Sequence, residues 1–80
     1  MEELIRTLIE PLVEHKEDIY IKCLDVDADG YLVYNVLVNK DDIGRIIGKR
    51  GNIAQAIRTI CYAAATRNKQ MVKINFDSYE

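Results

Sequence analysis

The stretch that decides the fold is residues 43–53, which read Ile43-Gly44-Arg45-Ile46-Ile47-Gly48-Lys49-Arg50-Gly51-Asn52-Ile53. Gly48 and Gly51 bracket two cations in a turn between two predicted helices. Glycine permits backbone conformations with positive φ and lets another part of the chain approach closely. The first turn of the second helix, residues 52–55, holds no carboxylate, so its free amides are available to an anion. Lys49 and Arg50 would add positive charge and phosphate donors. We therefore predict that this turn binds a phosphodiester backbone.

Upstream of the turn, the sequence predicts one helix and a β-hairpin. Apolar residues recur at spacings of three and four over roughly residues 2–14, which is typical of an amphipathic helix. Pro11 predicts a kink or an irregular last turn, because proline cannot donate a helical hydrogen bond. Alternating runs over residues 19–24 and 31–38 predict two strands. Between them lies Asp29-Gly30, which favours a type I′ turn with positive φ at both central residues.

Around the turn itself, the pattern predicts two helices and a last strand. We expect Asn39 to cap the first helix, with Asp41 and Asp42 in its first turn, and the helix to end at Gly48. A longer helix follows to about residue 68. The residues that we expect on its apolar face are Ile53, Ile57, Ile60 and Ala64. A short strand then runs from Val72 through Ile74 to Phe76, and the element order indicates an α+β domain over residues 1–80.

The composition is that of one small globular domain. The chain has 80 residues, of which 49% are hydrophobic and 30% charged. Its acidic first residues precede no long apolar run, so we expect no secretory signal and no membrane-spanning helix. Cys23 and Cys61 both lie in apolar patterns, and we expect them to be buried free thiols of a cytoplasmic protein.

The net charge of −2 conceals an uneven distribution along the chain. Residues 1–39 carry three basic and nine acidic residues, whereas residues 40–73 carry eight basic and two acidic residues. This asymmetry fits a face that attracts a polyanion, and it fits equally well a chance clustering of solvated charges. Charge alone therefore leaves both interpretations open.

Residues 46–53, which include Gly48-Lys49-Arg50-Gly51, resemble the signature of the KH domain. In that family a Gly-X-X-Gly loop between two helices clamps the backbone of a single-stranded nucleic acid. Two predicted strands before the loop and one after it resemble the type II, prokaryotic arrangement. The whole chain is similar to the small single-domain bacterial RNA-binding proteins of the KhpA type. The resemblance implies three helices packed on one face of a three-stranded mixed sheet.

The resemblance also implies a set of RNA-binding residues. They are Ile43, Gly44, Arg45, Ile47, Gly48, Lys49, Arg50, Gly51, Asn52 and Ile53. The amides of residues 48–51 would hold phosphates, and apolar side chains of the two helices would line one wall of a groove. The edge of the strand over residues 31–38 would supply the opposite wall. For Ile47 and Ile53, simple core packing is an equally good interpretation, and for Ile57 and Ile60 we favour core packing outright.

These features predict a protein that binds single-stranded RNA with low sequence specificity, as an RNA chaperone or post-transcriptional regulator. A ribosome-associated or assembly factor is an alternative, as is a protein-interaction adaptor with a vestigial RNA groove. Small side chains on the longer helix suggest association, and the resemblance implies a homodimer or a heterodimer with a larger KH-containing protein. These small side chains are Ala54, Ala56, Ala63 and Ala65, and Tyr62 lies among them in the sequence.

No chemistry beyond binding is expected from the sequence. It offers no paired nucleophile and base, and His15 with two distant cysteines does not make a zinc site, so we expect no enzyme, metal or cofactor. We expect no membrane and no small-molecule substrate either. Tyr20, Tyr31 and Tyr34 on the hairpin could stack on bases, although we favour packing against the sheet for most of them.

Overall fold

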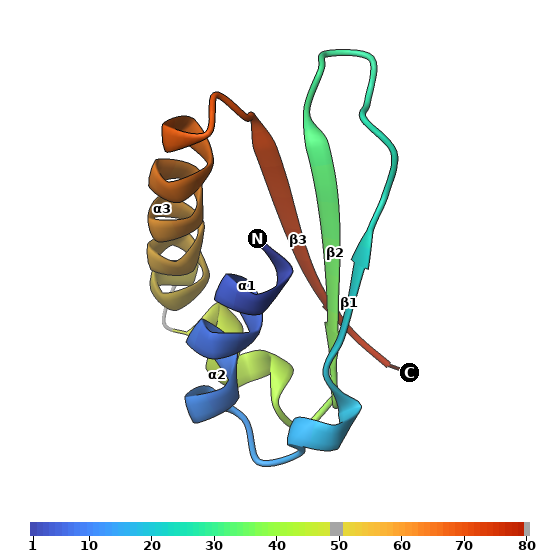
Figure 1. The fold of residues 1–80 in the computed structure, drawn as a ribbon. Helices are drawn as coiled ribbons and strands as arrows, with labels where there is room; N and C mark the ends of the chain where they lie inside the picture. Colours follow the sequence, from blue (N-terminus) through green and yellow to red (C-terminus); the bar gives the residue numbers. More distant parts are fainter. Residues whose placement is uncertain (49–50, 80) are drawn as a thin grey trace.

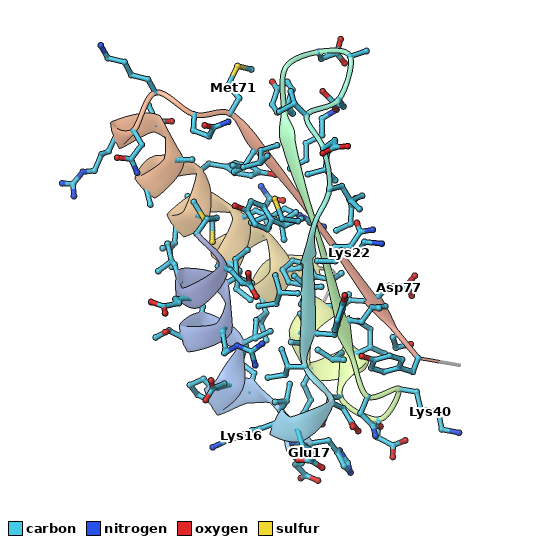
Figure 2. All side chains as sticks on the ribbon, turned by 45° about the vertical axis from the view of Figure 1, so that its right-hand side comes forward. Lys16, Glu17, Lys22, Lys40, Met71 and Asp77 are labelled. Carbon is cyan, nitrogen blue, oxygen red and sulfur yellow. The ribbon has the colours of Figure 1, made fainter. Side chains whose placement is uncertain are left out.

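The computed structural model describes residues 1–48 and 51–79, and it confirms three helices on one face of a three-stranded mixed sheet (Figure 1). The strands β1 (Tyr20–Cys23), β2 (Leu32–Val38) and β3 (Val72–Ser78) lie in the order β1-β2-β3. β1 pairs antiparallel with β2, and β3 pairs parallel with β2. The helices α1 (Glu2–Ile9), α2 (Ile43–Ile47) and α3 (Asn52–Arg67) cover one face. Lys22 and Asp77 project from the other face (Figure 2).

The helix predicted over residues 2–14 is divided at Pro11. α1 ends at Ile9, and a short 3₁₀ helix, η1 (Glu10–Leu12), holds the proline in its first turn. Proline is tolerated at that position because the first N–H groups of a helix have no intrahelical acceptor. A second 3₁₀ helix, η2 (Lys16–Asp18), leads into β1. The irregular ending that Pro11 predicts is confirmed. In the described part of the chain, no helix is both long and apolar enough to cross a membrane.

The hairpin turn between β1 and β2 differs from the predicted type I′ geometry. Gly30 has φ of 86°, but among residues 1–48 and 51–79 the non-glycine residue with positive φ is Lys69, not Asp29. A turn over Asp27–Gly30 forms instead, in which the Gly30 N–H donates to the Asp27 carbonyl oxygen at 3.0 Å. The Asp27 carboxylate also accepts from the N–H groups of Asp29 and Tyr31, at 3.0 and 2.9 Å. These hydrogen bonds to the Asp27 side chain stabilise a turn in which Gly30 has positive φ and Asp29 does not.

The core lies between the sheet and the helices, but α3 presents a different face to it than predicted. The buried residues of α3 are Ala54, Ile57, Cys61 and Ala65. Of the predicted face, Ile57 is buried, whereas Ile53 and Ile60 are exposed. The predicted and the observed stripe share Ile57 and run side by side along α3. The observed stripe has smaller side chains, which let the backbone of α3 lie close to the sheet. The prediction of two buried thiols is wrong for Cys23, which is exposed, and right for Cys61.

The start of α2 is held by Asp42 rather than by the predicted Asn39 cap. The Asn39 Oδ1 accepts from the Asp41 N–H at 2.8 Å, which makes an Asx turn before the helix. α2 begins at Ile43, and its first turn contains no acidic residue. The Asp42 side chain is only 1% exposed. Its carboxylate accepts from the N–H groups of Glu14 and His15, at 3.1 and 3.0 Å, and it lies 3.1 Å from His15 Nδ1. These contacts fix α2 to the segment that follows α1.

Candidate nucleic-acid interface

Gly48 ends α2 in a backbone conformation that other residues avoid. Its φ is 64° and its ψ is −168°, a region that is essentially restricted to glycine. A Cβ atom at Gly48 would also lie 2.7 Å from Ile53 Cγ1 and 2.8 Å from Ile53 Cδ1. The N–H of Gly48 donates to the Gly44 carbonyl oxygen at 2.9 Å, which closes the last turn of α2. Glycine is therefore required here both by the backbone and by the close approach of Ile53.

Gly51 occupies the N-cap position of α3 with φ of 76° and ψ of 10°. A Cβ atom there would meet nothing within 4 Å, so only the left-handed backbone favours glycine at this position. Among the described residues, no side chain caps the start of α3, and its first turn contains no acidic residue. The first N–H groups of a helix carry a partial positive charge, so a helix start of this kind can accept an anion. The predicted ligands Lys49 and Arg50 lie outside the described residues.

The apolar residues predicted to line a groove divide between core and surface. Ile46 is fully buried, whereas its neighbour Ile47, about 100° further round α2, is 44% exposed. Ile53 is 36% exposed on the first turn of α3. The alternative of core packing is therefore wrong for Ile47 and Ile53, and it is also wrong for Ile60. Ile43 is half-buried and packs against the core, while Gly44 is exposed. Two apolar side chains thus stand at the surface on either side of the turn.

Arg45 projects from α2 on the same side of the molecule as Glu14. Its Nη2 lies 2.7 Å from Glu14 Oε1, and both side chains are exposed. An exposed ion pair of this kind contributes only about 0–1 kcal/mol, because water and salt screen it. A phosphate could therefore compete with Glu14 for Arg45. Asn52, the other polar residue predicted for this site, is exposed on the first turn of α3.

The strand predicted to supply the second wall of the groove cannot do so. β2 is the central strand and is paired on both sides, so it has no free edge. The sequence order did not reveal this, because the chain crosses over from β2 to β3 through both α2 and α3. The strand with a free edge beside these helices is β3. The Leu32 N–H donates to the Met71 carbonyl oxygen at 2.8 Å. By the alternation of a parallel ladder, the backbone groups of Val72, Ile74 and Phe76 then point away from β2.

Arg58 joins α3 to the free edge of β3, and the sequence carried no signal for this role. Its Nε donates to the Ile74 carbonyl oxygen at 3.0 Å. Its guanidinium carbon lies 5.3 Å from the centre of the Phe76 ring, within the range of a cation–π contact. A planar cation thus stands over the seam between α3 and β3, within two turns of the glycine turn. In the sequence, nothing about Arg58 distinguishes it from the other arginines expected at the surface.

Comparison with known proteins places these features in one family. A family model described as KhpA/KhpB, KH domain, matches residues 2–76. The RNA-binding protein KhpA of Listeria monocytogenes serovar 1/2a is 45% identical over 74 residues, which cover 92% of this chain and 95% of the relative. The proteins of the same name from Lactiplantibacillus plantarum and Bacillus subtilis are 39% and 34% identical, over 92% and 100% of this chain and 85% and 94% of the relatives. The chain therefore belongs to the KhpA/KhpB family of KH domains.

Proposed function

We propose that this protein binds single-stranded RNA by clamping its sugar–phosphate backbone at the turn over residues 48–51. The observation that carries the proposal is the pair of glycines with positive φ at the end of α2 and the start of α3. That start has no acidic residue, and no side chain of the described residues caps it. The amides at that start would hold phosphate oxygens, and Lys49, Arg50 and Arg45 would supply positive charge. The names of the relatives, RNA-binding protein KhpA, support RNA as the ligand.

The bases would lie in the groove between the two helices and the free edge of β3. Ile43, Gly44, Ile47 and Ile53 would form its apolar wall, with Asn52 beside the phosphates. The backbone groups of β3 would form the other wall, where Arg58 already engages the Ile74 carbonyl oxygen. A KH groove holds about four nucleotides. Because most of the contacts would be to phosphates and to flat apolar surface, sequence specificity should be low, as suits a cytoplasmic RNA chaperone or post-transcriptional regulator.

One groove of this size gives modest affinity, so we propose that the protein associates with a second RNA-binding unit. Two units on one strand raise the overall affinity through effective concentration. The solvent-facing stripe of α3 formed by Ala56, Ile60 and Ala63 supports this. Ile60 is 47% exposed, and the two alanines would let another helix approach closely. The partner would be a second copy of this chain or a larger protein that contains a KH domain.

The test of the RNA-binding proposal is charge reversal at the loop. We expect the double variant Lys49→Asp and Arg50→Asp to lose binding of a fluorescein-labelled unstructured RNA, measured by fluorescence anisotropy. The matched control is Lys16→Asp with Lys22→Asp, which changes the net charge equally on η2 and β1. The control should lose far less affinity, and both variants should keep the melting temperature of the wild type within a few degrees.

Salt dependence provides a second readout of the same proposal. About four phosphate contacts on a single strand give a slope of roughly −3 in a plot of log affinity against log salt concentration. The loop variant should flatten this slope. Equal binding by the loop variant and the wild type, with both folded, would exclude the clamp. Failure of the folded wild type to bind RNA would leave the adaptor function.

A further inference from the structure

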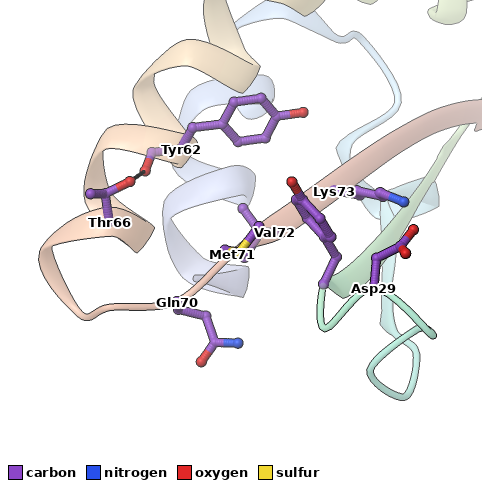
Figure 3. A pocket seen from close by; sticks show the side chains of 8 residues that line it. Asp29, Tyr62, Thr66, Gln70, Met71, Val72 and Lys73 are labelled. Atoms are coloured by element: carbon purple, nitrogen blue, oxygen red, sulfur yellow. Dashed lines mark hydrogen bonds between the residues drawn. The ribbon is translucent and has the colours of Figure 1, made fainter.

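A pocket of about 550 Å³ lies between the second half of α3 and the start of β3 (Figure 3). This end of α3 is the one distant from Gly51 and the start of the helix (Figure 1). The walls of the pocket come from the second half of α3, the loop before β3 and the tip of the hairpin. Pockets of roughly 300–1,000 Å³ are the size that holds small organic ligands. Its lining includes neither glycine of the turn, and it includes none of the residues of the proposed groove.

Two tyrosines give this pocket its character. Tyr62 is 37% exposed and extends from α3 toward β3, where Lys73 lies (Figure 3). Tyr31, the residue before β2, also lines the pocket, and its ring contacts Lys73. The Lys73 Nζ lies 4.7 Å from the centre of the Tyr31 ring and 2.9 Å from Asp27 Oδ2. Tyrosine rings are stiff and flat, so they stack on a planar ligand at low entropic cost.

The charges around the pocket argue against a phosphate as its occupant. The ammonium of Lys73 is already paired with Asp27, and this contact, together with the N–H groups of Tyr31 and Asp29, lowers the pKa of Asp27. Asp29 lines the pocket with a further carboxylate. The amide of Gln70 also lines the pocket. The hydroxyl of Thr66 donates to the Tyr62 carbonyl oxygen at 2.8 Å, so its proton is not available to a ligand. The pocket therefore suits a neutral flat ring that carries hydrogen-bond donors.

A nucleobase with an exocyclic amino group matches this chemistry. Carboxylates accept from the amino groups of bases, and glutamine pairs with adenine at N6 and N7. Adenine can donate its amino group to Asp29 or pair with Gln70, whereas uracil has no amino group to donate. The pocket also lies on the seam that leads from the glycine turn. Arg58 and Tyr62 are one turn apart on α3, and Tyr62 is about 15 Å along the helix axis from Asn52.

We propose that this pocket, formed around Tyr31, Tyr62, Asp29 and Gln70, binds one unpaired adenine of an RNA strand whose backbone is held at the glycine turn. The inference rests on the proposed RNA-binding function and extends it. The RNA footprint is then longer than the four nucleotides of the groove. Strands that reach the pocket gain affinity and a preference for adenine at one position.

The first experiment probes the pocket with mononucleotides, which are too short to occupy the glycine turn and the pocket together. Adenosine 5′-monophosphate and uridine 5′-monophosphate are added at millimolar concentration to the protein with labelled tyrosine rings, and the ring resonances are followed by NMR. We expect adenosine 5′-monophosphate to shift Tyr62 and Tyr31, uridine 5′-monophosphate to shift them much less, and neither to shift Tyr20, an exposed tyrosine on β1. Absence of any shift at Tyr62 overturns the proposal, whatever the fate of the loop clamp.

The second experiment compares a tetranucleotide with an adenine-containing dodecanucleotide. We expect Tyr62→Ala to weaken binding of the dodecanucleotide roughly tenfold, as the loss of one base–aromatic stack does, and to leave the tetranucleotide unchanged. Tyr62→Phe keeps the ring and should bind like the wild type, and Tyr20→Ala should be neutral. Replacing the adenines of the dodecanucleotide by uracils should remove the effect of Tyr62→Ala.

Three results would overturn the pocket while leaving the loop clamp intact. The first is an unchanged affinity of Tyr62→Ala for the dodecanucleotide, and the second is an equal loss for both lengths of RNA. The third is a change of the Tyr62→Ala variant from dimer to monomer in analytical ultracentrifugation, which would make the pocket a protein interface. Failure of the wild type to bind either RNA would instead refute the proposed function, and the mononucleotide experiment would still decide the pocket.

Discussion

Replacing Gly48 by alanine should damage the fold more than the same change at Gly51, three residues away. Gly48 combines a glycine-only backbone conformation with a Cβ position that lies 2.7–2.9 Å from three side-chain atoms of Ile53. Gly51 has positive φ as well, but space for a methyl group is open there. The two variants therefore differ in backbone region and in steric contact, while they remove the same kind of residue from the same turn.

The expected magnitudes follow from these two differences. A non-glycine residue in the conformation of Gly48 costs about 2–3 kcal/mol, and pushing Ile53 off its rotamer costs roughly 1 kcal/mol more. Gly51→Ala pays only for the left-handed conformation, about 1–2 kcal/mol. The Gly48 variant should thus be about 2 kcal/mol less stable than the Gly51 variant, which corresponds to roughly 8–16 °C in melting temperature for a domain of this size. Total stability for 80 residues is about 4–12 kcal/mol.

Urea denaturation followed by circular dichroism measures both variants on one scale. A third and a fourth protein, Ile53→Ala alone and together with Gly48→Ala, complete a double-mutant cycle. Truncating Ile53 to alanine removes Cγ1 and Cδ1 but keeps Cβ, which lies 2.9 Å from the added methyl group, so the clash is relieved only in part. The cycle should therefore give a coupling of roughly 0.5–1 kcal/mol. If the Gly48 and Gly51 variants unfold at the same urea concentration, or if the cycle shows no coupling, the steric argument for Gly48 is refuted.

Three more predictions follow from the core, from the His15 contact and from α3. Ile46→Ala should cost about 2–5 kcal/mol of unfolding free energy and Ile47→Ala less than about 1, because Ile46 is fully buried and Ile47 is exposed; equal urea midpoints would contradict this. The hydrogen bond to Asp42 raises the pKa of His15 above 6.5, so its stabilisation is complete below that pH and is lost as pH rises through the raised pKa. Urea midpoints should therefore fall as the pH rises from below 6.5 through the raised pKa, and His15→Gln should remove this fall. Ile60→Asp should abolish self-association in analytical ultracentrifugation with an unchanged urea midpoint, whereas an unchanged sedimentation profile would rule out this stripe as the interface.

At lower pH the same contact has a second limit, set by Asp42. Burial would raise the pKa of Asp42, but the hydrogen bonds from the N–H groups of Glu14 and His15 and from the His15 ring hold it below 3.8. The contribution of its charged form is therefore present above 3.8 and is lost as pH falls through the lowered pKa. The attachment of α2 to the segment after α1 is thus strongest between these two pKa values, near neutral to mildly acidic pH.

The candidate site was largely readable from the sequence because its determinants are local. Two glycines three residues apart, a helix start without acids and adjacent cations are properties of one short segment, and the positive φ of Gly48 and Gly51 follows the prediction. Arg58 and Tyr62 could not be found in this way. Their significance comes from β3, which is far away in the sequence and is brought beside α3 by the crossover.

The sequence by itself determined the order of the elements, the break in the first helix before Pro11 and the glycine turn. These features depend on backbone preferences and on contacts over a few residues. Only the tertiary structure decided that β2 is central, that Asp42 rather than Asn39 secures α2, and that α3 buries Ala54 and Cys61 in place of Ile53 and Ile60. In each case the local sequence offers two neighbouring alternatives. Contacts between distant parts of the chain decide among them. The face of α3, the position of β2 and the carboxylate of Asp42 are each fixed by what they meet when the sheet and the helices pack together.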